Sequence, residues 1–220
     1  MRTDHAIFLR ALSALLSYPD AEVRAALPEI GAVVRDARDV KGATRDALLA
    51  LIDELSRRDA LDAEARFVDL FDRGRSTSLN LFEHVHGDGR ERGPAMLDLR
   101  QRYLEAGLEP SGNELPDHVP MLLEYLSCSD AAEMQETLGD CAHIVRAIGN
   151  RLLKRHSRYA AVFGALLELA RVDGLDPHAP VPAPENLDIS WEERPAFAND
   201  RAPPCRPSDF QPGLVPKRGD

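Results

Sequence analysis

Apolar residues recur at intervals of three and four along most of the chain, the spacing of an amphipathic helix. The first stripe is followed by Pro19, which ends a helix soon after Tyr18. Two further stripes follow, and Gly74 is a plausible stop signal for the later one. The members of the three stripes are Ile7, Ala11, Leu12, Leu15 and Leu16; Leu48, Leu51, Ile52 and Leu55; and Phe67, Leu70 and Phe71.

The clearest helix is predicted to begin near Asp130. This aspartate can cap the helix, and Glu133 three residues later completes the sequence pattern of a capping box. The apolar stripe that follows predicts one helix that continues to about residue 152. Ser157 is a candidate cap for a further helix. The apolar positions of the two helices are Leu138, Cys141, Val145, Ile148 and Leu152, and Phe163, Leu166, Leu167 and Ala170.

The chain has no alternating run long enough to indicate a strand, and no internal repeat. We therefore predict an all-α fold, a compact bundle of several helices over residues 1–173. Residues 174–220 hold ten of the sixteen prolines, which exclude regular helix and favour extended backbone. We expect a Pro-rich flexible tail, extended or disordered. This tail either docks locally through Trp191 and Phe197 or is a terminus without a role.

Composition and charge narrow the classes of partner and compartment. Aromatic residues make up only 5% of the chain, which suits packed helices, and the formal net charge is −10. That charge disfavours nucleic acid and anionic membranes as partners and favours a basic partner. The first twenty residues are no secretory signal, since Asp4, His5 and Arg10 interrupt them. The most apolar window, residues 160–170, is too short to span a bilayer, so we expect a soluble cytoplasmic protein without direct membrane insertion.

Common catalytic motifs are missing from the sequence. Cys128, Cys141 and Cys205 are far apart and odd in number, so they predict neither a CxxC site nor a disulfide framework. The run "GDGRERG" lacks the preceding strand and the spacing of a phosphate-binding loop. No serine or cysteine nucleophile stands in a recognisable context. We therefore expect neither catalysis nor a permanent cofactor.

The segment "EHVHGDGRER", residues 83–92, carries the most concentrated candidate chemistry. His84 and His86 suggest a metal site, but on a helix they would point to different sides, and no third ligand with suitable spacing follows. Glu83 or Asp117 paired with a histidine suggests a general base. The alternative is a polar corner between two helices with His84 buried, its glycines turning the chain and Pro94 in the first turn of the next helix.

The segment "NELPDHVP", residues 113–120, also allows two interpretations. Pro116 suits a helix start, which places Asp117 in the first turn, where the helix dipole favours an anion. Pro120 is then awkward and predicts a distorted first turn before "MLLEYL". Tyr125 has an apolar body and a polar tip, which suits a groove wall or, equally, the edge of the core.

Together these segments resemble a known family. "SLNLFEHVHGDGRERGPAMLDLRQRYLEAGL" followed by "NELPDHVPMLLEYLS" is similar to the nitrate reductase delta-subunit family, the NarJ-type molybdenum cofactor assembly chaperones. "FLRALSALLSYPD" resembles the opening of the family, "RFVDLFDRGRSTSLNLFEHVHG" runs into its central block, and "SWEERPAFA" resembles its late tryptophan–acidic element. The resemblance therefore covers most of the chain.

The resemblance implies a cytoplasmic chaperone with the helical fold of redox-enzyme maturation chaperones. It implies binding to the catalytic alpha subunit of respiratory nitrate reductase, notably its N-terminal segment. Such a chaperone holds the apo-enzyme during insertion of the molybdenum cofactor and delays membrane docking, without being an enzyme. The alternatives are a maturation chaperone for another molybdoenzyme and, from a different class, a small metal-dependent hydrolase centred on the histidines.

Within the matching motifs, seven residues are candidates for partner binding. The carboxylates can pair with partner cations, and the histidines can hydrogen-bond and modulate binding with pH near neutrality. Packing by Leu79 and Phe82 can matter more than these polar groups, and His84 and Asp117 can instead meet each other and only stabilise the fold. The seven candidates are Glu83, His84, His86, Arg90, Asp117, His118 and Tyr125.

Overall fold

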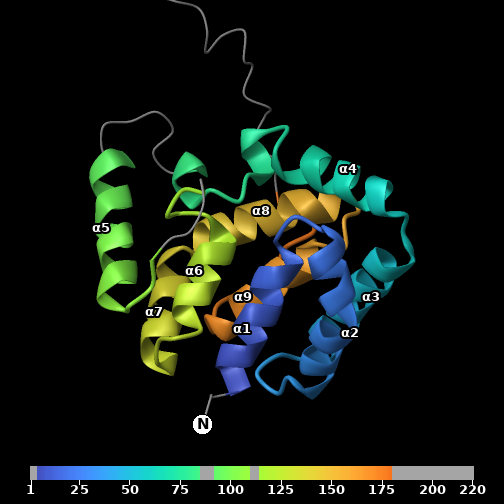
Figure 1. Cartoon of the computed structure of the whole chain (residues 1–220), viewed down its shortest axis with the longest axis horizontal. Helices are drawn as coiled ribbons and strands as arrows, with labels where there is room; N and C mark the ends of the chain where they lie inside the picture. The colour runs from blue at the N-terminus through green and yellow to red at the C-terminus, as the bar shows by residue number, and fades with distance from the viewer. Residues whose placement is uncertain (1–3, 85–91, 110–113, 180–220) are drawn as a thin grey trace, which may run out of the picture. The chain divides into compact units, whose positions relative to one another are not determined.

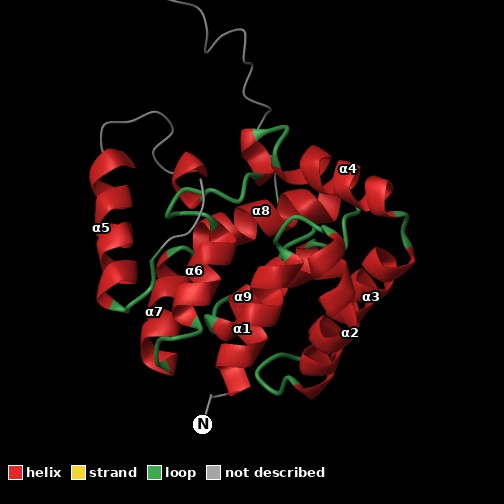
Figure 2. Ribbon diagram, in the orientation of Figure 1, coloured by secondary structure: helices red, strands yellow, loops and turns green. Residues whose placement is uncertain are grey.

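The computed structural model describes residues 4–84, 92–109 and 114–179, and its secondary structure in these ranges is helical (Figures 1 and 2). The prediction of an all-α fold is confirmed. One isolated extended pair, Asn80 with His118, is the only β-bridge in these ranges. The α-helices are α1 Asp4–Leu15, α2 Ala21–Asp36, α3 Gly42–Arg57, α4 Ala60–Phe71, α5 Arg92–Glu105, α6 Val119–Leu126, α7 Ala131–Asp140, α8 Ala142–Lys154 and α9 Ala160–Leu169; the short 3-10 helices are η1 Arg75–Thr77 and η2 Leu81–His84.

The core is built around α8 and α9, which pack along each other. α1 lies against α6 and α2, and α3 packs against both α2 and α9 (Figure 1). α9 contacts α3, α7 and α8, and Val162, Phe163 and Leu167 on it are fully buried. A helix enclosed on several sides needs apolar residues all round, so the most apolar window of the sequence falls here. Within the described ranges, no helix has the length and apolar character needed to cross a membrane.

The N-terminal stripe is predicted correctly except at its first position. Its other members are buried, but Ile7 is 42% exposed, and Phe8 and Leu9 are buried instead. Successive helical residues are about 100° apart, so the face that buries Phe8 and Leu12 turns Ile7 away from α2 and α6. The first position of a short apolar stripe is therefore a weak guide to the buried face.

The prediction of a single helix from Asp130 to residue 152 is wrong, because the helix is interrupted at Cys141. Asp130 does cap α7, accepting hydrogen bonds from the N–H groups of Ala132 and Glu133, both at 2.9 Å. α7 ends at Asp140, and Cys141 has φ −93° and ψ 4°, outside the helical well. The apolar spacing continues across the break because Leu138 on α7 and the stripe residues on α8 are all buried. Periodicity alone therefore could not show the break.

Two predicted boundaries also shift by a few residues. α9 has Tyr159 as its N-cap, and Ser157 lies two residues earlier, where its Oγ accepts a hydrogen bond from Tyr159 N at 3.4 Å. α4 ends at Phe71, so Gly74 lies beyond the helix. The existence of these helices was predictable, whereas the residues at which they begin and end depend on local hydrogen bonding.

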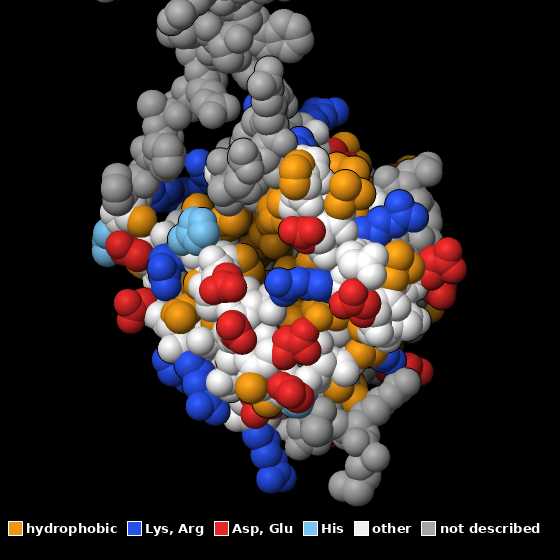
Figure 3. All heavy atoms as spheres, turned by 90° about the vertical axis from the view of Figure 1, so that its left-hand side faces the viewer, with side chains coloured by type: hydrophobic (Ala, Val, Ile, Leu, Met, Phe, Trp, Pro, Cys, Tyr) orange, Lys and Arg blue, Asp and Glu red, His pale blue; other side chains and the backbone are white. Residues whose placement is uncertain are grey.

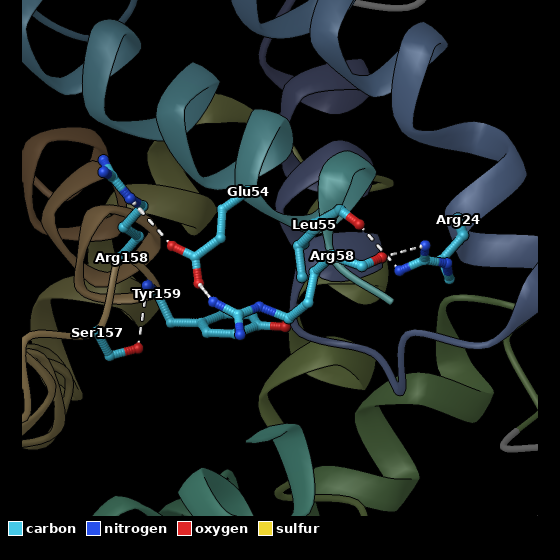
Figure 4. A network of polar contacts seen from close by, with 7 residues as sticks. All are labelled: Arg24, Glu54, Leu55, Arg58, Ser157, Arg158 and Tyr159. Atoms are coloured by element: carbon cyan, nitrogen blue, oxygen red, sulfur yellow. Dashed lines mark hydrogen bonds and ion pairs between the residues drawn. The ribbon is translucent and has the colours of Figure 1, made fainter. Parts of the chain in front are cut away.

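Ion pairs tie the start of α9 to α3 (Figure 4). Glu54 accepts a hydrogen bond at 2.8 Å from Arg58, the residue that follows α3, and forms an ion pair at 3.0 Å with Arg158, just before α9. Arg24 of α2 donates to the carbonyl oxygens of Leu55 and Arg58, at 2.9 and 2.8 Å. Side chains therefore satisfy the carbonyls at the end of α3, which would otherwise lack helical partners.

Three helices end with a residue in the left-handed region: Gly107 (φ 76°) after α5, His156 (φ 52°) after α8 and Arg171 (φ 56°) after α9. In each case the next N–H bonds to the carbonyl five residues earlier, as in Leu108 N to Tyr103 O at 2.8 Å. This closure reverses the chain sharply at the end of α5 and returns Leu108 toward the bundle.

The first residues of the predicted tail pack against the bundle. Leu175 is partly buried in a notch over Gly149 on α8, where a side chain at position 149 would collide with it. The N–H of Asp176 donates to Asn150 Oδ1 at 2.8 Å. The rest of the predicted tail, residues 180–220, lies outside the described part of the chain.

Candidate functional site

The two segments singled out in the sequence lie side by side in the fold. The bridge between Asn80 and His118 is flanked by two main-chain hydrogen bonds. Leu81 N donates to Asp117 O at 3.1 Å, and Val119 N donates to Leu79 O at 2.9 Å. The backbone therefore fixes η2 against the start of α6, although the two lie more than thirty residues apart in the sequence.

Asp117 lies beneath this junction and is fully buried. Its Oδ2 accepts a hydrogen bond from Phe82 N at 2.8 Å, and its Oδ1 has no hydrogen-bond partner. Burial raises the pKa of this carboxyl above its usual value, although the hydrogen bond from Phe82 and the charge of Arg92 act in the opposite direction. The side chain faces the interior of the fold.

The start of α6 differs from the sequence prediction. The helix begins at Val119 with His118 as its N-cap, so Pro116 and Asp117 precede the helix and are not in its first turn. Pro120 is then the second helical residue, where its missing N–H leaves no bond unmade. The predicted distortion at Pro120 is therefore wrong, because the start of the helix was placed too early.

His84 and Glu83 are also held by neighbours within the fold. The ring of His84 forms a hydrogen bond through Nε2 with Ser78 O at 3.0 Å, and burial lowers its pKa. Glu83 lies 3.8 Å from Arg92, and both side chains are 24% exposed. His84 and Asp117 thus have separate hydrogen-bond partners, and both contribute to the same polar junction.

The metal interpretation concerns His84 and His86, of which His84 lies in the described part of the chain. In the described ranges, no three His, Cys, Asp or Glu side chains are grouped as a metal site would require. His86 and Arg90, two of the candidate residues, lie outside the described residues. Pro94 does lie in the first turn of α5, as the polar-corner interpretation predicts.

A groove of about 350 Å³ opens beside this junction. Its apolar lining includes Tyr103, Leu108, Pro120, Met121 and Tyr125, which come from α5, the turn after it and α6. The side of the molecule on which α5 lies is hollowed, with apolar side chains visible in the hollow and acidic side chains around it (Figure 3). The groove is therefore a candidate binding site of a size that suits one or two large side chains.

Two tyrosines form the floor of the groove. The rings of Tyr103 and Tyr125 lie 5.1 Å apart and are tilted by 47°. Tyr103 donates through its hydroxyl to Pro116 O at 2.7 Å, and Tyr125 donates to Glu133 on α7. Tyr125 is 7% exposed, so it belongs to both the groove wall and the edge of the core.

The rim of the groove is acidic. Glu109, Glu114 and Glu124 are exposed and line it, and no lysine or arginine is found among the described lining residues. His118 also lines it, with Nδ1 4.0 Å from a carboxylate oxygen of Glu114. Burial lowers the pKa of His118, and Glu114 opposes this shift. The rim therefore carries negative charge that a cationic ligand would neutralise.

Several groove residues were not identified from the sequence. Tyr103 lies within the segment that resembles the family, but its spacing gives no sign that its hydroxyl reaches Pro116. Ser17 and Tyr18 come from the turn after α1, about a hundred residues from the rest of the lining. Only the packing of α1 on α6 brings them there, so no local pattern could have shown their role.

Comparisons with known proteins support one family. Residues 17–165 match the nitrate reductase delta subunit family. The nitrate reductase molybdenum cofactor assembly chaperone NarJ of Escherichia coli K12 is 40% identical over 195 residues, which cover 85% of this chain and 83% of that protein. The probable chaperone NarW of the same organism is 35% identical, covering 90% and 86%. A probable NarJ of Bacillus subtilis is 32% identical, covering 75% and 89%.

The matched region includes the η2–α6 junction and every part of the groove lining described above. The match also exceeds half of the chain. On these grounds, the chain belongs to the nitrate reductase delta subunit family.

Proposed function

We propose that this protein is a chaperone for respiratory nitrate reductase that binds the catalytic alpha subunit before the enzyme is complete. The observation that carries the proposal is the likeness to the NarJ chaperone of Escherichia coli over more than four-fifths of both chains. In this role the protein holds the apo-enzyme while the molybdenum cofactor is inserted and delays docking at the membrane. In this role it catalyses no reaction and needs no cofactor of its own.

The groove beside α6 supports the N-terminal segment of the alpha subunit as the bound element. An amphipathic helix binds a groove by placing apolar residues of one face into it. Tyr125 and Met121 offer that helix an apolar floor. Glu109 and Glu124 at the rim suit lysines or arginines beside the apolar face. Such rim charges contribute more to association rate and orientation than to affinity.

The candidate residues then divide into two roles. His118 and Tyr125 line the groove, so we assign them to partner contact. Asp117 is buried, and Glu83 and His84 are bonded to neighbours in the fold, so we assign these three to bracing the groove wall. For His86 and Arg90, partner contact stays a prediction.

Calorimetric titration with the N-terminal peptide of the alpha subunit tests the proposal. We expect binding in the micromolar range or tighter, and a loss of about 5-fold to 10-fold for Glu124→Lys, because the reversal turns one rim attraction into a repulsion. Glu29→Lys on α2 is the matched control. This substitution makes the same change in net charge, and Glu29 is exposed and lies outside the groove.

Two results would contradict the proposal. One is the absence of heat with the wild-type chain at high micromolar peptide. The other is equal or tighter binding of the N-terminal peptide of a different molybdoenzyme, which would assign the chaperone to another enzyme. If Glu29→Lys weakens binding as much as Glu124→Lys, the partner responds to net charge and the groove is not its site.

A further inference from the structure

Helix α5 is attached to the bundle more weakly than its neighbours. The extensively packed helix pairs in the described ranges, such as α8 with α9 and α1 with α6, do not include α5. Of its residues only Tyr103 is buried, and Leu97 and Leu104 are 67% and 45% exposed. α5 also stands apart from the other helices at one side of the bundle (Figure 1).

The apolar floor of the groove is largely covered in the observed arrangement. Tyr103 is 1% exposed and Tyr125 is 7% exposed, so their rings offer a partner little accessible apolar surface. The open space of about 350 Å³ admits one or two partner side chains. One wall must therefore move before the apolar face of a helical segment can be buried on these rings.

The wall that can move is the one formed by α5 and the turn that follows. The opposite wall consists of α6 and the turn after α1, and α1 packs closely on α6. α5 contributes Tyr103, and the turn contributes Leu108 and Glu109. Moving this side takes Tyr103 and the partly buried Leu99 and Leu108 out of the apolar core, whereas moving α6 would disrupt its extensive contact with α1.

We propose that α5 is a movable wall of the groove, which swings away from α6 to admit the apolar face of a helical partner segment. The proposal rests on the function proposed above and specifies how that site opens. Tyr103 is the latch: it is 1% exposed, and its hydroxyl bond to Pro116 O holds α5 against the segment that leads into α6. When α5 moves outward, Tyr103 leaves the floor and uncovers Tyr125 and Met121.

The variant Tyr103→Phe tests the hydrogen bond of Tyr103 separately from the packing of its ring. It keeps the aromatic packing on Tyr125 and removes only the hydrogen bond to Pro116, so the closed arrangement loses about 5-fold in population relative to the open one. Tyr159→Phe is the matched control, because the buried hydroxyl of Tyr159 has no hydrogen-bond partner to lose. Both variants are made in the full chain.

Two measurements test the movable wall. A 14-residue helix that leaves the bundle is only marginally stable by itself, so its amide hydrogen bonds open more often. Hydrogen exchange of the α5 amides, followed by mass spectrometry without any partner, is therefore expected to rise about 5-fold in Tyr103→Phe and to stay unchanged in Tyr159→Phe. Titration with the N-terminal alpha-subunit peptide is expected to show about 5-fold tighter binding to Tyr103→Phe, because opening costs less before binding.

The outcomes distinguish this inference from the proposed function. Unchanged α5 exchange in Tyr103→Phe, or faster exchange with affinity that stays equal or falls, overturns the movable wall while leaving the chaperone assignment intact. Faster exchange of α5 together with no peptide binding by any variant supports the movable wall and overturns the proposed partner.

Discussion

At the scale of single residues, Asp117 combines a structural bond with an unfavourable charge. Its Oδ2 satisfies Phe82 N, whereas its buried Oδ1 has no partner. We expect Asp117→Ala to lower the free energy of unfolding by about 1–3 kcal/mol, because Phe82 N loses its acceptor in a partly buried position. Asp117→Asn keeps an acceptor and removes the charge, so its stability at pH 7 is expected to equal or exceed that of the wild type.

Urea denaturation of both variants, followed by circular dichroism, measures these differences. If Asp117→Asn is as destabilising as Asp117→Ala, the charge itself contributes to the fold; if neither variant lowers the stability, the assigned bracing role is wrong. Peptide titration then shows whether that charge serves the partner.

The two half-buried histidines should make stability depend on pH. Burial lowers the pKa of His84 and of His118 below 6.5, so the unfolded chain binds protons more readily than the folded chain just below that pH. The folded state therefore loses stability as the pH falls through the interval below 6.5. This also moves the titration of both histidines away from neutrality, where the sequence had suggested that they act.

Asp117 contributes with the opposite sign. Its raised pKa means that the folded state binds the proton more readily, so its contribution to stability falls as the pH rises from 3.8 through the raised value. We expect the free energy of unfolding to decrease between pH 7 and pH 5.5, and His84→Gln to reduce that decrease. A wild-type stability that is flat over this range would contradict the assignment.

At the scale of elements, Gly149 and Gly139 differ although both are helical. A Cβ at position 149 would lie 2.4 Å from Leu175 Cδ2 and 2.9 Å from Phe163 Cβ, whereas nothing lies within 4 Å of one at position 139. We expect Gly149→Ala to cost about 1–3 kcal/mol through overpacking between α8 and α9. Gly139→Ala should instead stabilise α7 by about 0.5–1 kcal/mol, because alanine favours helix.

Thermal unfolding of the two variants provides the comparison, since they carry the same substitution. A similar effect at both positions would mean that Leu175 moves aside without cost, and that the notch is not a close contact in solution.

At the scale of the whole molecule, local periodicity predicts the helices but not how they are placed. The stripes at 48–55 and 67–71 are buried as expected, because each depends only on one helix having one apolar side. The break at Cys141 and the exposure of Ile7 depend on neighbouring helices, which a local pattern does not contain. The sequence therefore predicts elements better than it predicts their ends.

The residues that line the groove were even less predictable from the local sequence. Tyr125 and His118 were identified from the sequence, but Tyr18 and Tyr103 reach the groove only through tertiary packing. Its acidic character is likewise invisible in any one segment. A net charge of −10 suggests a basic partner without showing where that partner binds.

The seating of Leu175 over Gly149 also affects how the protein can be shortened. A fragment that ends at residue 173, where the helical pattern stops, would remove the leucine and leave a hollow between α8 and α9. It would also remove the N–H that binds Asn150. The shortest fragment that keeps the bundle closed ends near Ala179, whose carbonyl accepts a hydrogen bond from Lys154.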